Sequence, residues 1–109
     1  MNAQKFVGNW RSLKTELLAS FTDAQAGTEV AAMVQALRLT PAQHTQLRTV
    51  LDAALRDTLY TLLLGLDGAA SIGGDQQSYT LHDENGQLVA EPGELEMAAW
   101  EAFHGEDAA

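Results

Sequence analysis

The residue types that could do chemistry in this chain are concentrated in one glycine-rich stretch, Gly65–Gly86, which reads GLDGAASIGGDQQSYTLHDENG. It holds five of the nine glycines. Between them stand carboxylates, hydroxyls and an imidazole: Asp67, Ser71, Asp75, Ser78, His82, Asp83 and Glu84. Such groups serve as metal ligands, as general acids and bases, or as a nucleophile with its base. Each of these uses requires the residues to stand at a particular spacing along the chain.

The spacing fits neither a calcium loop nor a phosphate loop. An EF-hand needs oxygen ligands at its first, third and fifth positions, glycine at the sixth and glutamate at the twelfth. With Gly86 at the sixth position, Leu81 is first and Pro92 is twelfth, and a register on Gly68 fails in the same way. A phosphate loop needs a lysine after its glycines. No lysine or arginine follows Arg56.

Nucleophilic catalysis is no better supported. The chain has no cysteine, which excludes thiol chemistry and disulfides. Ser71 or Ser78, with His82 and Asp83, supplies the residue types of a triad, but the G-x-S-x-G turn is missing. The three histidines show no metal-ligand spacing: His44, His82 and His104. We predict no catalytic residue, no metal and no cofactor, and the alternative is a small-molecule or divalent-metal-dependent enzyme that uses the Asp67–Glu84 loops.

Charge narrows the range of partners. The net charge is −9, and all six basic residues lie within the first 56 positions. From Asp67 onward there are ten acidic residues and no lysine or arginine. Phosphate backbones and anionic lipid repel such a block, so we exclude nucleic acid and membrane and favour a basic protein. The first residues lack the apolar core of a secretory signal, and the expected location is the cytoplasm.

The elements that must position these residues begin with three helices in one domain, residues 1–109. Apolar spacing predicts a helix over residues 3–23, through Phe6, Trp10, Leu13, Leu17 and Phe21. Thr28 predicts the cap of a short second helix. Thr40 with Gln43 forms a capping box for a third, which we expect to end at Gly65. Its expected buried seam is Leu47, Val50, Leu51, Ala54, Leu55, Leu59 and Leu62.

After this helix the apolar pattern changes. Residues 78–82 and 87–90 read as two strands around an Asn-Gly turn, and residues 70–72 could add a third strand. A final helix is expected over residues 94–104, ending at Gly105. The predicted fold class is α+β: three N-terminal helices, a small antiparallel hairpin or three-stranded sheet, and a C-terminal helix.

The final helix carries the strongest candidate site. Its expected core face is Leu95, Ala98, Ala99, Ala102 and Phe103. Met97, Trp100 and His104 cluster on the opposite face, flanked by glutamates, which is the composition of an interface hot spot with a charged rim. The alternatives are that both faces are buried, or that the tryptophan lies flat on the surface. The predicted partner-binding residues are Trp100, Met97, His104, Glu96, Glu101, Asp83 and Glu84.

Two runs of the C-terminal half, LLLGLDGAASIGGDQQSYTLHDENG and GELEMAAWEAFH, are similar to small acidic uncharacterised bacterial proteins of the toxin-immunity kind. The resemblance implies that the chain binds and neutralises a cognate toxin, such as a basic nuclease, and it transfers no site residue. Our leading hypothesis is a protein-binding module that masks a basic partner. A structural homodimer closed by the Trp100 face is a further alternative, weakened by glutamates that would face each other across the two-fold axis.

Overall fold

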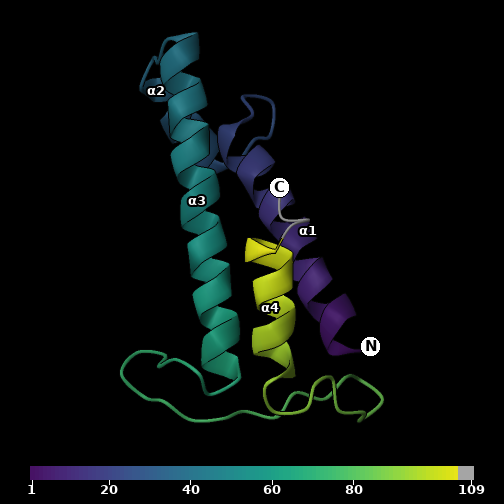
Figure 1. Ribbon diagram of the computed structural model, residues 1–109. Helices are drawn as coiled ribbons and strands as arrows, with labels where there is room; N and C mark the ends of the chain where they lie inside the picture. The colour runs from purple at the N-terminus through teal and green to yellow at the C-terminus, as the bar shows by residue number, and fades with distance from the viewer. Residues whose placement is uncertain (106–109) are drawn as a thin grey trace. The chain divides into compact units, whose positions relative to one another are not determined.

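The computed structural model describes residues 1–105. They form four helices: α1 (Ala3–Thr22), α2 (Glu29–Ala36), α3 (Pro41–Leu66) and α4 (Glu94–His104) (Figure 1). The four predicted helices are therefore confirmed. The predicted capping box at the start of α3 is also present, since the Gln43 N–H donates to Thr40 Oγ1 and the Thr40 N–H to Gln43 Oε1. No helix in this part of the chain is both long enough and apolar enough to cross a membrane.

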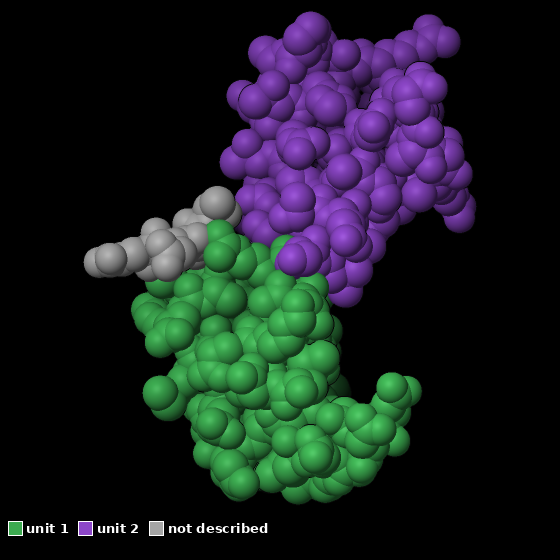
Figure 2. All heavy atoms as spheres, turned by 90° about the vertical axis from the view of Figure 1, so that its right-hand side faces the viewer, with its two compact units in different colours: residues 1–11, 57–109 green, residues 12–56 purple. Residues whose placement is uncertain are grey.

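The chain divides into two compact units (Figure 2). By their residue ranges, α1 and α3 each contribute to both units. Unit 1 comprises residues 1–11 and 57–109, and unit 2 comprises residues 12–56. Unit 1 has eleven acidic and two basic residues, whereas unit 2 has four of each. The net charge of −9 therefore belongs to unit 1 alone, and unit 2 is neutral.

Three helices build the core of unit 1, where α4 lies between the N-terminal part of α1 and the C-terminal part of α3 (Figure 1). The buried cluster is Ala3, Val7, Leu59, Leu63, Leu95, Ala98, Ala99 and Phe103. Ala98 and Ala99 are nearly or fully buried, and their small side chains allow α4 to approach its neighbours closely. The core face predicted for the last helix is confirmed, with Ala102 half-buried at its edge.

The predicted seams of α1 and α3 are largely wrong. On α3, Leu59 is buried as expected, but Val50, Ala54 and Leu62 are exposed, and the fully buried residue is Leu63, which the seam omits. On α1, Leu13 of the predicted stripe is exposed and its other four residues are half-buried, whereas Ala3 and Val7 lie in the core. Both helices carry apolar side chains around much of their circumference, so spacing alone does not select the buried face.

The predicted α+β fold class is wrong, because no sheet forms among residues 1–105. The segment between α3 and α4 contains only two isolated bridges, Ile72 with Asp75 and His82 with Leu88. The Asn-Gly reversal is present, since the Gly86 N–H donates to the Asp83 carbonyl at 3.0 Å. The expected strand backbone finds another partner, however, because the Tyr79 N–H donates to the carbonyl of Leu66 at the end of α3.

The end of α3 also differs from the prediction, because Gly65 lies inside the helix and Gly68 ends it. The Ala69 N–H donates to the Leu64 carbonyl and the Gly68 N–H to the Gly65 carbonyl, which is the Schellman pattern with Gly68 in the left-handed region at φ 80°. Gly65 serves close packing instead. A Cβ there would lie 2.5 Å from Cγ1 of Ile72.

The interior of unit 2 contains polar groups. Lys14 is buried on α1, and its ammonium lies 2.7 Å from Oδ1 of Asp52, which is 39% exposed. Thr22 is also buried, and its hydroxyl donates to the Leu18 carbonyl and accepts from the Arg48 guanidinium. Because the Lys14 ammonium has little access to water, Asp52 supplies the interaction that solvent would otherwise provide.

Replacing Asp52 should therefore lower the free energy of unfolding more than replacing Lys14 does. We expect Asp52→Ala to lower the free energy of unfolding by about 2 kcal/mol, because it leaves a buried ammonium unpaired. Lys14→Met should cost less than about 1 kcal/mol, because the remaining carboxylate can be hydrated and the apolar stem is replaced. Urea titrations of both variants measure the difference. Equal losses would contradict this account of the pair.

Candidate protein-binding surface

The outer face of α4 is exposed, which settles the orientation that the sequence left open. Met97 is 68% exposed and Trp100 is 55% exposed, whereas the opposite face of the same helix lies in the core of unit 1. His104, in the last turn, is exposed on the same side as Trp100. The helix is therefore not buried on both sides.

A tyrosine from α3 joins these residues. The rings of Trp100 and His104 are stacked, with centroids 4.9 Å apart and planes 27° apart. Tyr60 meets His104 edge-on at 4.7 Å and approaches Trp100 at 6.4 Å. We call Tyr60, Met97, Trp100 and His104 the aromatic surface. Because the rings hold one another in place, Trp100 should lose less side-chain entropy on binding than an isolated exposed tryptophan would.

Two carboxylates border an open groove on this surface. The groove has a volume of about 350 Å³ and is lined by Tyr60, Glu96, Met97, Trp100 and Glu101. Its lining combines an aromatic and thioether floor with two negative charges, and contains no basic residue. Such a groove suits a side chain that has both an apolar stem and a cationic end, as lysine and arginine do.

The structure brings five of the seven predicted partner-binding residues together and leaves out Asp83 and Glu84. These two lie in the segment between α3 and α4 and do not line the groove. The Asp83 carboxylate accepts from the Asn85 N–H at 2.9 Å and the Gln87 N–H at 3.0 Å, which stabilises its own turn. Glu84 is exposed within the same turn.

Asp67 fixes the start of the helix that carries the aromatic surface. The first residue before α4, Gly93, has no side chain to cap it, so the cap comes from the other end of the connecting segment. Asp67 Oδ1 accepts from the Gly93 N–H at 2.9 Å, and its Oδ2 accepts from the Glu96 N–H at 3.0 Å. The carboxylate also lies favourably at the positive end of the α4 dipole. Sequence reasoning missed both Asp67 and Tyr60, because each acts across a long sequence separation.

Loss of this distant cap should be measurable. We expect Asp67→Ala to lower the free energy of unfolding by about 1–2 kcal/mol, the usual cost of losing a helix cap. The free energy of unfolding of Asp67→Asn should lie between those of the wild type and Asp67→Ala, since asparagine keeps one acceptor oxygen and loses the charge. Asp75→Ala is the matched control, because that exposed carboxylate has no helix to cap and its loss should cost less than about 0.5 kcal/mol. Urea unfolding of the three variants decides the matter, and equal effects of Asp67→Ala and Asp75→Ala would contradict the capping role.

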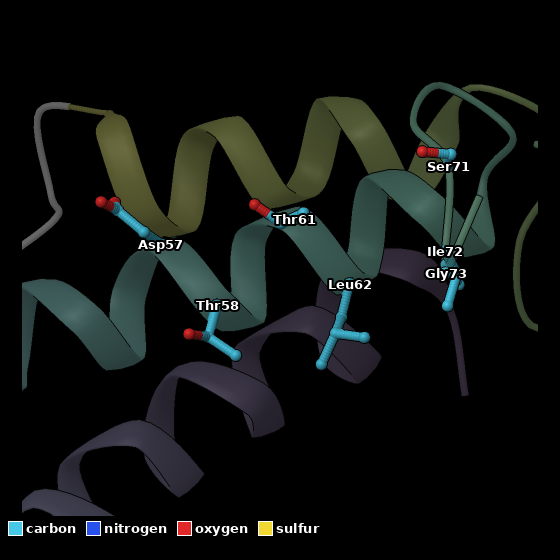
Figure 3. A pocket seen from close by; sticks show the side chains of 7 residues that line it. All are labelled: Asp57, Thr58, Thr61, Leu62, Ser71, Ile72 and Gly73. Atoms are coloured by element: carbon cyan, nitrogen blue, oxygen red, sulfur yellow. The ribbon is translucent and has the colours of Figure 1, made fainter.

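A second hollow, of about 470 Å³, lies between α3 and the turn that follows it (Figure 3). It is lined by Asp57, Thr58, Thr61, Leu62, Ser71, Ile72 and Gly73. Figure 3 shows Asp57 and Ser71 at opposite ends of the hollow, so the carboxylate and the serine hydroxyl do not form a catalytic pair. Of the loop carboxylates invoked by the enzyme alternative, none lines it. One of these loop carboxylates, Asp67, lines another hollow of about 240 Å³ together with Ser78 and Glu91, and there it accepts from the N–H groups of Gly93 and Glu96.

Within residues 1–105, no three histidine, aspartate or glutamate side chains gather as metal ligands would. Comparison of the chain with protein-family models, with curated proteins and with solved structures finds no match. The aromatic surface with its two glutamates is the candidate site that we consider further.

Proposed function

We propose that this chain is a protein-binding module whose aromatic surface docks onto a basic protein. The observation that supports the proposal most directly is Trp100, which is more than half exposed yet stacked on His104 beside Tyr60. A large aromatic held in this way at the surface is typical of an interface anchor. Tryptophan exposed without a partner would keep a large apolar area in water.

Charge supplies the second part of the argument. Unit 1, which carries the aromatic surface, holds the whole net charge of −9. That field attracts a basic partner from a distance, and Glu96 and Glu101 then lie at the groove where its lysine or arginine side chains would enter. Trp100 and Met97 would supply the apolar contact that holds the complex, so that charge governs association and the aromatic contact governs dissociation.

The sharpest form of the proposal is that the partner is a toxin, which the chain masks. This form rests on the acidic aromatic surface, which suits a basic nuclease, and on the resemblance to toxin-immunity proteins noted above for two runs of the C-terminal half. Binding over such a surface would neutralise a basic protein by covering its cationic site, with no chemical step required.

Capture from a lysate of the cells that carry this protein tests the proposal. The immobilised chain is washed at low and at high salt, beside a Trp100→Ala variant and a Tyr79→Ala control, which removes another exposed aromatic of unit 1. We expect a basic protein that is retained at low salt, released at high salt, lost with Trp100→Ala and kept with Tyr79→Ala. Identical retention by the wild type and Trp100→Ala would sink the proposal.

The toxin form needs a second result. The captured protein, expressed alone, should arrest growth, and co-expression with the wild-type chain should restore growth. Co-expression with Trp100→Ala should fail to restore it. A captured protein that is harmless when expressed alone would leave the binding module in place and remove the toxin from the proposal.

A further inference from the structure

Unit 2 carries a separate apolar surface on α2. Val30, Met33 and Leu37 are 38%, 62% and 60% exposed. Leu37 is the C-cap of α2 and keeps a helical backbone conformation, so the spacing of three and four residues places all three on one side. Ala31 and Val34 are buried, so α2 is already anchored to its own unit by a different face. We call Val30, Met33 and Leu37 the α2 stripe. A stripe of this spacing is what a helix presents to another helix.

The charges at the two ends of the stripe are opposite. Glu29 begins α2, and Arg38 follows it directly after Leu37, with both residues exposed. If a second copy lies antiparallel against the stripe, its Arg38 falls beside Glu29 of the first copy, and the two-fold axis repeats the same pairing at the other end. A stripe with a negative start and a positive end is therefore complementary to itself.

The net charges of the units favour the same pairing. Unit 2 has four acidic and four basic residues, so two copies can meet there without net repulsion. Two copies that meet through unit 1 would bring surfaces of net charge −9 together. A dimer formed through Trp100 brings this charge to its interface, whereas a dimer formed through α2 joins units that have no net charge.

The backbone at Arg38 provides an independent observation. Its φ of 53° lies in the left-handed region, where every other residue with positive φ in residues 1–105 is a glycine. Helices commonly end on glycine at such a position, because any side chain there adds strain. An arginine kept in this conformation gives up stability that glycine would provide, which indicates that its side chain has a use.

We infer that the chain forms a two-fold dimer in which the α2 stripes of two copies pack antiparallel, with Glu29 and Arg38 paired between copies. The dimer uses unit 2 and stands apart from the proposed function, which uses the aromatic surface of unit 1. One short helix per copy gives a small interface, so association should depend on concentration.

Cross-linking of the full chain tests the geometry, since the sequence has no cysteine. In the antiparallel arrangement, Met33 lies next to the two-fold axis, within the Cα separation of about 7 Å that a disulfide requires. Met33→Cys should therefore form a disulfide-linked dimer much faster than Met97→Cys. The two methionines are almost equally exposed, at 62% and 68%, which makes Met97→Cys the matched control. Equal rates would overturn the inference.

Sedimentation over a range of protein concentrations tests the charges. Glu29→Arg and Arg38→Glu, made singly, should each raise the dimer dissociation constant about tenfold, and the double variant should restore it. Arg38→Gly should weaken the dimer while leaving the isolated chain at least as stable to urea, which separates lost association from lost folding. A chain that stays monomeric throughout the range, or a double variant that fails to restore association, would overturn the inference.

Discussion

Leu63→Ala is expected to lower the free energy of unfolding by about 3 kcal/mol, the largest stability loss we expect from any single truncation in the chain. Leu63 is completely buried at the centre of the unit 1 core, where side chains of α1, α3 and α4 meet. Truncation removes apolar contacts with all three helices and leaves a cavity that their backbones cannot close. Against a total stability of about 5–15 kcal/mol, this is a large fraction.

The neighbouring residue provides the control. Leu62 belongs to the same helix but is 39% exposed, so Leu62→Ala changes helix propensity equally and should cost less than about 1 kcal/mol. Urea unfolding of the two variants separates core packing from helix propensity. Equal destabilisation would mean that the core of unit 1 is not centred on Leu63.

Trp100→Ala should raise the dissociation constant of the complex with the basic partner by roughly 30-fold, which corresponds to about 2 kcal/mol. The expected loss is large because the indole is both the largest exposed side chain of the groove and the ring on which His104 stacks. Because Trp100 is more than half exposed, its removal should leave the free energy of unfolding within about 1 kcal/mol of the wild type. Isothermal titration with the purified partner gives the affinity.

Variants of the two groove glutamates separate the contribution of charge to the association rate from that of Trp100 to the dissociation rate. Glu96→Gln together with Glu101→Gln should slow association and flatten its salt dependence, while changing the dissociation rate less than Trp100→Ala does. Tyr79→Ala should bind as the wild type does. An unchanged affinity for Trp100→Ala, in a chain that unfolds normally, would show that the partner binds elsewhere.

The sequence predicted those features that depend on neighbouring residues. The caps at Thr28 and Thr40 are satisfied by amides three residues away, so their signals lie within a single turn. The faces of α4 were also predicted correctly, because every charged residue of that short helix lies away from the side formed by Leu95, Ala98, Ala99 and Phe103. Most of the candidate site follows from this separation.

The features that sequence reasoning missed depend on distant partners. Tyr60 reaches Trp100 from another helix, and Asp67 caps α4 from 26 residues before Gly93. The prediction of a sheet was wrong for a related reason, since a hairpin is stable only when a further strand or a helix face packs against it. Its turn formed at Asp83, but Tyr79 donates its N–H to the end of α3 in place of a strand. The apolar spacing of α3 did not reveal Leu63, because leucines surround the helix near its C-terminal end.

The clamp that Asp67 forms on α4 makes the intervening chain a convenient place for a label. Its hydrogen bonds to Gly93 and Glu96 hold the two ends of residues 67–93 together, so the residues between them need not set the distance between α3 and α4. At the turn formed by Gly73 and Gly74 nothing lies within 4 Å of where a side chain would start. Doubling the length of a flexible loop costs only about 0.6 kcal/mol. A short peptide tag inserted there should leave α4 in its place.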